Sequence, residues 1–282
     1  MTAPPPKLAD AVNTFFIARV EAGATEEHMP AYSAQAMVFV SGAMVMRPGS
    51  ATEERLEGVV CTAPLLSAAP ITIEGPALVV GASLTPLGWQ GLAKLPADTV
   101  NDRAVPAEEV FTPERLEALY EGSEQCRRSV ISPDELREIL AQAVGDRRHA
   151  IRPDHAAFVQ KATRWLASDL NPRVDKLYAE AGVSVRTAQR LCRRFFGVAP
   201  AQLAKRYRAI RAAMLLANPH LPQAMQEAIR DAYFDQAHLI RDIRRYTGRT
   251  PTRLADGESL IDGTLDPQAH GAGARILREK EV

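Results

Sequence analysis

Residues 175–195 read DKLYAEAGVSVRTAQRLCRRF, and this stretch decides how the C-terminal half of the chain folds. The pattern predicts two short helices that meet at Gly182, because glycine lets the backbone turn without a steric clash. Ser184 is a natural N-cap, since its hydroxyl accepts from a backbone N–H of the next turn. The residues that the second helix is predicted to bury are Ala188, Leu191, Cys192 and Phe195.

The same pattern recurs at residues 226–248, QEAIRDAYFDQAHLIRDIRRYTG. A short helix, a corner at 232–234, an N-cap at Asp235 and a second helix are again predicted. Both copies end in a similar stop signal, a glycine with a proline shortly after it, in FFGVAP at 195–200 and YTGRTP at 246–251. The residues that this second helix is predicted to bury are Leu239, Ile240, Ile243 and Tyr246.

Each second helix leaves arginine and glutamine side chains on its outer face. Arginine can bind the O6 and N7 atoms of guanine with two hydrogen bonds, and glutamine can bind N6 and N7 of adenine in the same way. A single unit of this kind also suits an ordinary helical hairpin with a solvated basic face. Two units in tandem are a much more specific signal of DNA reading.

Residues 171–254 resemble the DNA-binding domain of the AraC/XylS family of transcription regulators. The runs AGVSVRTAQRLCRRFFGVAP, RAIRAAMLL and DQAHLIRDIRRYTGRTP carry the resemblance, together with their spacing. It implies two helix-turn-helix units that are joined by a long helix and enter successive major grooves of double-stranded DNA. Two positions depart from the family pattern, since Ala232 stands where glycine is usual and Cys192 where phenylalanine is usual.

The resemblance also implies, position by position, which side chains read base edges, and placement on exposed helical faces indicates which others hold phosphates and fix the register. The base-contact candidates are Arg186, Thr187, Gln189, Arg190, Gln236, His238 and Arg241. The phosphate-contact candidates are Ser184, Arg193, Arg194, Lys205, Asp235, Arg244 and Arg245. The alternative is a protein-interaction module that uses the same basic face. The salt dependence of binding would distinguish the two functions, because affinity for a DNA duplex falls steeply as the salt concentration rises.

The charge distribution supports a division of the chain into two domains. Residues 1–151 carry 12 Lys and Arg against 20 Asp and Glu, whereas residues 152–256 carry 19 against 9. Such an asymmetry suggests a polyanionic partner for the basic part. We therefore predict a regulatory domain over 1–151, a linker at 146–154, a DNA-binding domain over 152–256 and a disordered tail over 257–282.

The N-terminal part is predicted to be mainly β, with strands near 14–21, 32–46, 55–62, 77–82 and 85–95 and a barrel or double-sheet fold. A helical segment over 112–144 follows, and the apolar stripe of its second helix, 132–144, either packs on the strands or forms a dimer contact. The fold class is thus α+β, with an all-α C-terminal domain whose joining helix spans 200–217. At ~1.5 Å per residue this helix is ~27 Å long, close to the ~34 Å between major grooves on one DNA face.

The N-terminal part also resembles the β-type regulatory domains that precede this DNA-binding domain in the family, through ALVVGASLTPLGWQGLAKLPADTVNDRAVPAEEVF, and in particular those of an uncharacterised subgroup. That resemblance implies effector binding, dimerisation or both. Four aromatic residues either line an effector pocket or are plain core. These residues are Phe16, Tyr32, Phe39 and Trp89.

No catalytic motif for a serine hydrolase, a zinc protease or a nucleotide-binding enzyme is present, so we expect no enzyme activity. No His or Cys pair has metal-ligand spacing, and we expect neither a metal nor a cofactor. Cys61, Cys126 and Cys192 lie far apart in sequence, which favours reduced thiols and a cytoplasmic location. No targeting or membrane segment is predicted. Expected partners besides DNA are RNA polymerase, a small-molecule effector and a second copy of the chain.

Overall fold

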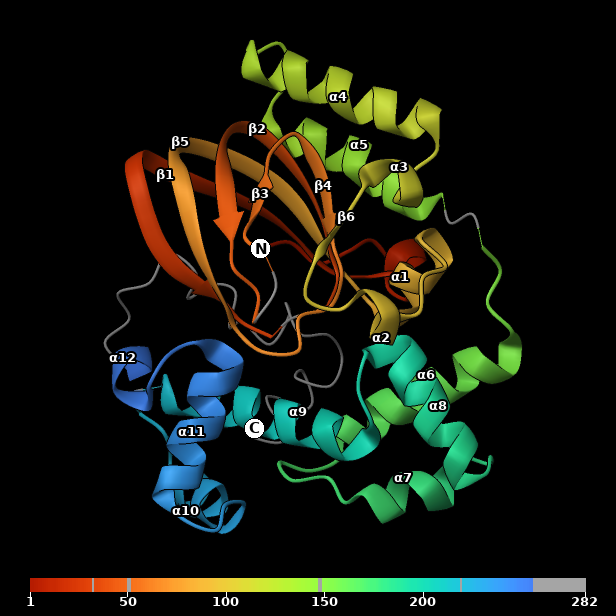
Figure 1. Ribbon diagram of the computed structural model, residues 1–282, viewed down its shortest axis with the longest axis vertical. Helices are drawn as coiled ribbons and strands as arrows, with labels where there is room; N and C mark the ends of the chain where they lie inside the picture. The colour runs from red at the N-terminus through yellow and green to blue at the C-terminus, as the bar shows by residue number, and fades with distance from the viewer. Residues whose placement is uncertain (32, 50–51, 147–148, 219, 256–282) are drawn as a thin grey trace.

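The structure is a computed structural model, and it describes residues 1–31, 33–49, 52–146, 149–218 and 220–255. Figure 1 shows a curved β-sheet with its own helices and, below it, a group of helices formed by the C-terminal part of the chain. The predicted α+β fold class is confirmed. The predicted tail 257–282 and part of the predicted linker, residues 147–148, lie outside the described residues.

The N-terminal strands form one antiparallel sheet in the order β1-β5-β2-β4-β6, with β3 beside β2. Neighbouring side chains point to opposite faces, so Val38 and Val40 join the core under the helices, whereas Met37 and Phe39 join a second cluster on the other face. Among the described strands no pairing joins β1 to β6, so the sheet is curved but not closed into a barrel. The strands are β1 (Val12–Met29), β2 (Gln35–Met46), β3 (Glu54–Leu56), β4 (Val59–Thr62), β5 (Ala69–Leu84) and β6 (Ala104–Val105).

The prediction of a strand over 85–95 is wrong, because helix α1 (Pro86–Leu92) occupies that segment. Thr85 caps the helix by accepting a hydrogen bond from the Gly88 N–H, and Pro86 fits the first helical position. Its residues are almost all buried, so no polar face marks a helical period in the sequence. Two further short helices follow, α2 (Ala97–Val100) and α3 (Ala107–Val110), and a short 3-10 helix, η1 (Pro6–Leu8), precedes β1.

The two helices predicted within 112–144 are present as α4 (Pro113–Arg127) and α5 (Pro133–Gly145). Ser132 and Glu135 form the predicted capping box at the start of α5. The apolar stripe of α5, including Leu136 and Leu140, is buried in the core cluster on the sheet. Packing against the sheet therefore accounts for this stripe, and Figure 1 shows both helices lying along the upper edge of the sheet.

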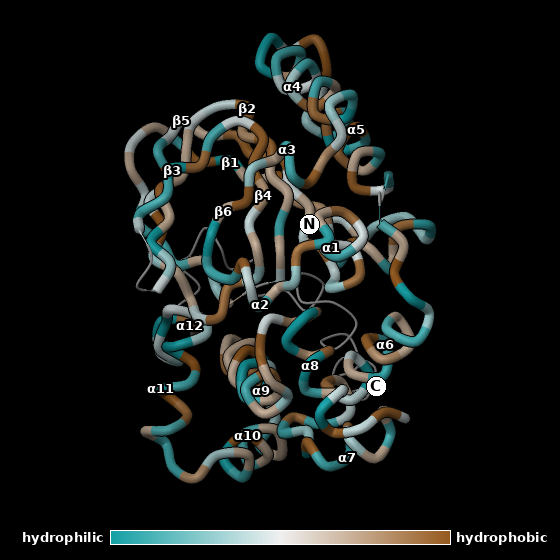
Figure 2. Tube along the Cα trace, turned by 45° about the vertical axis from the view of Figure 1, so that its right-hand side comes forward, coloured by the Kyte–Doolittle hydropathy of each residue, from teal (hydrophilic) through white to brown (hydrophobic). Residues whose placement is uncertain are grey.

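The C-terminal part of the described chain is helical from Pro153 to Ala255. Long helix α9 (Pro200–Leu216) lies between two helix pairs, with α8 near one end and α11 near the other, and Figures 1 and 2 agree on this arrangement. The other helices are α6 (Pro153–Ala167), α7 (Val174–Glu180), α8 (Val185–Phe196), α10 (Gln223–Asp231), α11 (Gln236–Thr247) and α12 (Pro251–Ala255).

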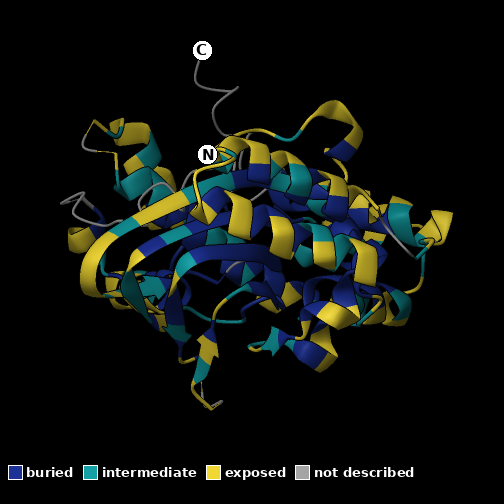
Figure 3. Cartoon of the chain, turned by 90° about the horizontal axis from the view of Figure 1, so that it is seen from above, coloured by how far each residue is buried: buried dark blue, intermediate teal, exposed yellow. Residues whose placement is uncertain are grey.

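The two halves of the chain pack on each other. Leu87 of α1 belongs to the cluster that fills the core of the first helical unit, and Ala31 belongs to a cluster with Ile210 and Tyr246. Figure 3, viewed from above, shows buried residues concentrated in the middle of the molecule and exposed ones around the rim. No helix among the described residues is long and apolar enough to cross a membrane.

Candidate nucleic-acid interface

The first helix-turn-helix unit is formed by α7 and α8, as the sequence predicts. Gly182 adopts the left-handed conformation at the corner, with φ of +70°, and the Ser184 hydroxyl accepts a hydrogen bond of 3.2 Å from the Thr187 N–H. The four predicted core residues of α8 are buried. Cys192 is fully buried, and burial raises the pKa of its thiol to about 12. This thiol therefore fills a core position and stays protonated.

The second unit is formed by α10 and α11. Asp235 caps α11 by accepting a hydrogen bond of 2.6 Å from the His238 N–H. Ala232 at the corner has φ of −74° and ψ of −10°, which is right-handed helical backbone. This corner therefore does not need a glycine, and alanine stands there without strain.

The two second helices have the same length and the same ending. Helices α8 and α11 each contain 12 residues, and Gly197 and Gly248 terminate them in the left-handed conformation. In α11, Ile243 and Tyr246 are buried as predicted, whereas Leu239 is half-buried. The prediction that Ile240 is buried is wrong, because 37% of this side chain is exposed.

Most of the predicted contact residues lie on the outer faces of α8 and α11. Within the described chain none of the exposed arginines among them forms an ion pair with an acid, so their charges are available to a polyanion. The exposed candidates are Ser184, Arg186, Arg190, Arg193, Asp235, Gln236, Arg241, Arg244 and Arg245. The half-buried candidates are Thr187, Gln189, Arg194, Lys205 and His238.

Lys205 and His238 are drawn into an ionic cluster around Asp242, which the sequence reasoning missed. The Asp242 carboxylate is 1% exposed and lies 3.0 Å from Lys205 Nζ, 3.2 Å from an Arg208 guanidinium nitrogen and 3.2 Å from His238 Nε2. The His238 ring also packs edge-to-face on Tyr233, with centroids 5.4 Å apart. In this structure Lys205 joins α9 to α11 through Asp242, and His238 contacts the same acid from within α11.

Three other half-buried candidates have local contacts. Gln189 donates to the Tyr178 hydroxyl over 3.3 Å, and Thr187 shares a hydrogen bond of 3.0 Å with Ser184. Arg194 has its Nε buried without a hydrogen-bond partner in the described chain and lines a small cavity beside His155. The freely exposed arginines, such as Arg190 and Arg241, are therefore better placed for a duplex than Arg194.

The match to a family model settles what these two units are. Residues 177–256 match the model described as a helix-turn-helix domain, and this range covers α8, α9 and α11. This part of the chain is an AraC-type helix-turn-helix domain. The match supports a DNA-binding transcription regulator, and proteins of that class are typically not enzymes.

The solved structures that match this chain have low sequence identity to it. ToxT from Vibrio cholerae O395 is 11% identical, with 85% of this chain and 95% of that chain covered and a TM-score of 0.47. Unsaturated-fatty-acid-bound ToxT from Vibrio cholerae strain SCE256 is 10% identical, with 93% and 97% covered and a TM-score of 0.47. The AraC-like transcriptional activator CuxR is 16% identical, with 73% and 78% covered and a TM-score of 0.30. No curated protein sequence matches the chain.

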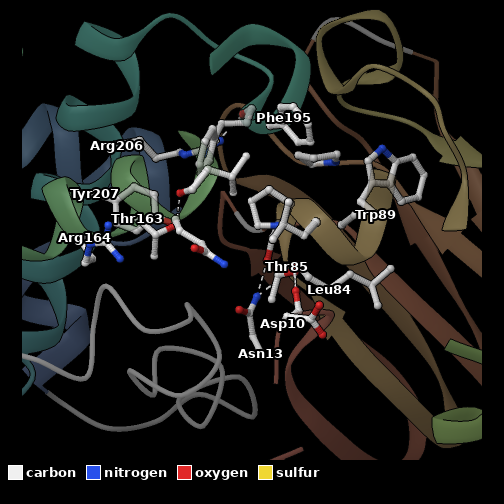
Figure 4. A pocket seen from close by; sticks show the side chains of 18 of the residues that line it. Asp10, Asn13, Leu84, Thr85, Trp89, Thr163, Arg164, Phe195, Arg206 and Tyr207 are labelled. Carbon is white, nitrogen blue, oxygen red and sulfur yellow. Dashed lines mark hydrogen bonds between the residues drawn. The ribbon is translucent and has the colours of Figure 1, made fainter. Parts of the chain in front are cut away.

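A cavity of about 450 Å³ lies between the AraC-type domain and the N-terminal half. Figure 4 shows its lining, with Asp10, Asn13, Thr85 and Trp89 on the N-terminal side and Phe195 and Arg206 among the residues on the other. Arg206 is 6% exposed and donates to the carbonyls of Leu65 and Phe196, at 3.3 and 3.5 Å. This cavity therefore contacts the end of α8, the joining helix and the N-terminal half together.

Three of the four aromatic residues considered for an effector pocket are described, and these three do not come together. Trp89 lines the cavity between the domains and donates through its ring N–H to the Leu95 carbonyl. Phe16 and Phe39 belong to the apolar cluster on the other face of the sheet. Tyr32 lies outside the described residues. Sequence reasoning had no signal for the cavity itself, since its walls come from segments that are far apart in the chain.

Proposed function

We propose that this chain is a sequence-specific transcription regulator in which each protomer reads two successive major grooves of one duplex. The single observation that carries the proposal is the pair of matched helices, α8 and α11, at the two ends of α9. Each presents exposed arginines on its outer face. A helix of 17 residues at ~1.5 Å per residue spans ~26 Å, and the proposal is supported because this length is close to the ~34 Å between major grooves on one DNA face.

The residue roles follow from exposure and position. Arg186 and Arg190 of α8 and Gln236 and Arg241 of α11 lie in the first two turns and face base edges, with Thr187, Gln189 and His238 beside them. The exposed residues near the helix ends hold phosphates, and this group is Arg193, Arg244 and Arg245 together with the caps Ser184 and Asp235. Lys205 and Arg194 hold phosphates from less exposed positions.

Control of DNA binding comes through the N-terminal half, residues 1–151, acting on the DNA-binding half, residues 152–256. We propose that a small-molecule effector occupies the cavity between them, because a molecule there contacts α1, α8 and α9 at once. We also propose that the chain contacts RNA polymerase and pairs with a second copy of itself. Thermal-shift screening of small molecules against the full chain tests the effector. Substitution of Thr163 by Phe, at a half-buried position that lines the cavity, is the control and should remove the shift.

Selection of duplexes from a random pool by the full chain tests the proposed reading. We expect one enriched sequence with two conserved segments. On that sequence Arg190→Ala and Arg241→Ala each lose ~1–3 kcal/mol of binding free energy and relax the base preference in one segment. Arg55→Ala, which removes an exposed arginine of β3, is the matched control and leaves the affinity unchanged.

Salt dependence separates DNA binding from a protein-interaction module. We expect the logarithm of the affinity to fall linearly with the logarithm of salt concentration, with a slope near −0.9 for each neutralised phosphate. No enrichment from the pool, or an affinity that does not change with salt, contradicts the proposal.

A further inference from the structure

The turn that ends each reading helix rests on the N-terminal half of the chain. After α8, the Gly197 carbonyl accepts a hydrogen bond of 3.2 Å from Asn101, which follows α2. After α11, Gly248 lies so close to His28 of β1 that an added Cβ would collide with the histidine side chain. These two contacts occupy equivalent positions of the repeat, at the left-handed glycine that terminates the helix.

The second unit is tied to the N-terminal half at three more points. The Ala31 N–H donates to the Tyr246 carbonyl and the Ala68 N–H to the Arg245 carbonyl, both over 2.8 Å. The Arg249 guanidinium lies 2.9 Å from the Glu27 carboxylate, and their side chains are only 6% and 14% exposed. A buried ion pair depends on both partners, because removing one leaves a desolvated charge without its counter-ion.

Without other contacts, the joining helix would fix the distance between the two units only loosely. A tilt of about 10° at one end of a helix ~26 Å long moves its other end by ~4–5 Å. Successive nucleotides along a DNA strand are ~3.4 Å apart, so this displacement exceeds one base-pair step. A second connection that bridges both units removes most of that freedom, and the β domain supplies one through Asn101 at α8 and Glu27 at α11.

We propose that Glu27 and Asn101 are positioning residues for DNA reading. Together with α9, the N-terminal domain fixes the distance and the rotational phase between α8 and α11, although neither Glu27 nor Asn101 touches DNA. The inference rests on the proposed two-groove function. It assigns the regulatory domain a direct part in sequence specificity, because the domain sets which spacing of the two DNA segments is read.

A spacing series tests the inference. The probes are duplexes selected from a random pool by the full chain, with base pairs removed or inserted between the two conserved segments, and affinity is measured for each. The wild-type chain should prefer one spacing, with a loss of about tenfold when one base pair is added, since a misplaced unit loses base contacts. Glu27→Gln and Asn101→Ala should bind the best spacing several-fold more weakly and flatten this preference to about threefold or less.

Matched controls carry the same chemical change at neighbouring positions. Glu26→Gln neutralises an exposed carboxylate one residue away on β1, and Asp98→Ala truncates an exposed side chain of α2. Both should keep the wild-type spacing profile. The double exchange Glu27→Arg with Arg249→Glu restores an ion pair in reversed order and should recover most of the preference.

The outcomes are distinguishable. If the wild-type chain shows no preferred spacing, the two-groove function itself has failed. Suppose that the wild type prefers one spacing and that the variants lose affinity by the same factor at every spacing. The contacts are then merely structural and the inference is overturned. Tighter binding by the variants at all spacings also overturns it, because the contacts then hold a form that does not bind DNA. If Glu27→Gln does not fold, the result for Asn101→Ala decides. We expect Asn101→Ala to fold, because the side-chain oxygen that it removes is buried without a hydrogen-bond partner in the described chain.

Discussion

At the scale of single residues, Asp242 shows how a buried charge organises one reading unit. Its carboxylate is almost fully buried and accepts contacts from two helices, α9 and α11, through three basic side chains. Arg208 in addition packs over the Tyr233 ring, 4.3 Å from its centroid. Asp242 thus joins α11 to the joining helix, beside the apolar cluster that contains Ala213 and Ile243.

Neutralising this acid should destabilise the protein. We expect Asp242→Asn to lower the free energy of unfolding by about 3 kcal/mol, because it leaves the buried charge of Arg208 without its counter-ion. Asp231→Asn changes an exposed acid of α10 and serves as the control, with an effect below ~0.5 kcal/mol. Urea unfolding of the two variants measures the difference, and equal midpoints would refute the role given to Asp242.

His28 should make the stability of the protein depend on pH. Its pKa is lowered, first by burial and then by the nearby positive charges of Arg249, Arg253 and Arg244, although Glu27 acts in the opposite direction. A lowered pKa means that the unfolded chain binds the proton more readily, so stability falls as the pH drops below about 6.5, the ordinary value for histidine. The pKa of His155 is lowered by burial as well and acts in the same direction.

Urea midpoints at pH 7.5 and pH 5.5 measure this dependence. The wild-type midpoint should fall on acidification, and His28→Gln should reduce the fall. His220→Gln, which changes an exposed histidine after α9, should not. If the midpoint of His28→Gln fell as much as that of the wild type, His28 would not be a source of the pH dependence.

Residue roles were predictable from sequence where a repeated pattern fixes them, as for the buried face of α8 and the caps Ser184 and Asp235. The position of His238 was not predictable in this way. Its place in the repeat suggests a base contact, but its ring packs on Tyr233 and faces Asp242. Contacts of that kind depend on which side chains another helix brings near, and the spacing within one helix carries no information about them.

At the scale of elements, the corners of the two units differ in their backbone. Gly182 is left-handed, whereas Tyr233, which also stands two residues before the N-cap, has a negative φ and Ala232 before it is right-handed. Gly182→Ala should therefore destabilise the protein by ~1–2 kcal/mol through backbone strain. Ala232→Gly should cost less, ~0.5–1 kcal/mol, through greater freedom of the unfolded chain. Urea unfolding of both variants checks the order, and a larger loss for Ala232→Gly would contradict it.

Element boundaries were predictable where polar and apolar residues alternate with a clear period. The helix pair α4 and α5 has a polar face and strong caps, and both helices begin where they were expected, although α4 extends to Arg127, beyond its predicted end at residue 121. Helix α1 is buried all round and was mistaken for a strand. Strand β1 extends to Met29, well beyond the predicted end at residue 21. Nothing in the sequence indicated this extension, because the second half of the strand is mostly exposed at the edge of the sheet and carries no apolar alternation.

At the scale of the whole molecule, the division into an acidic and a basic part was visible in the charges, but the contact between the two parts was not. The cavity lined by Trp89 and Arg206 and the ion pair of Glu27 with Arg249 join residues that are more than a hundred positions apart. Through the Asn101–Gly197 hydrogen bond and the Glu27–Arg249 ion pair, the sheet domain rests on both helix-turn-helix units. The central claim remains that one chain reads two grooves.

Hydroxyl-radical footprinting of the full chain on a selected duplex tests that claim most directly. We predict two protected segments on one face of the DNA, with centres about 10 base pairs apart. Arg190→Ala should weaken protection first in one segment and Arg241→Ala in the other. A single protected segment in which both substitutions act would contradict the account.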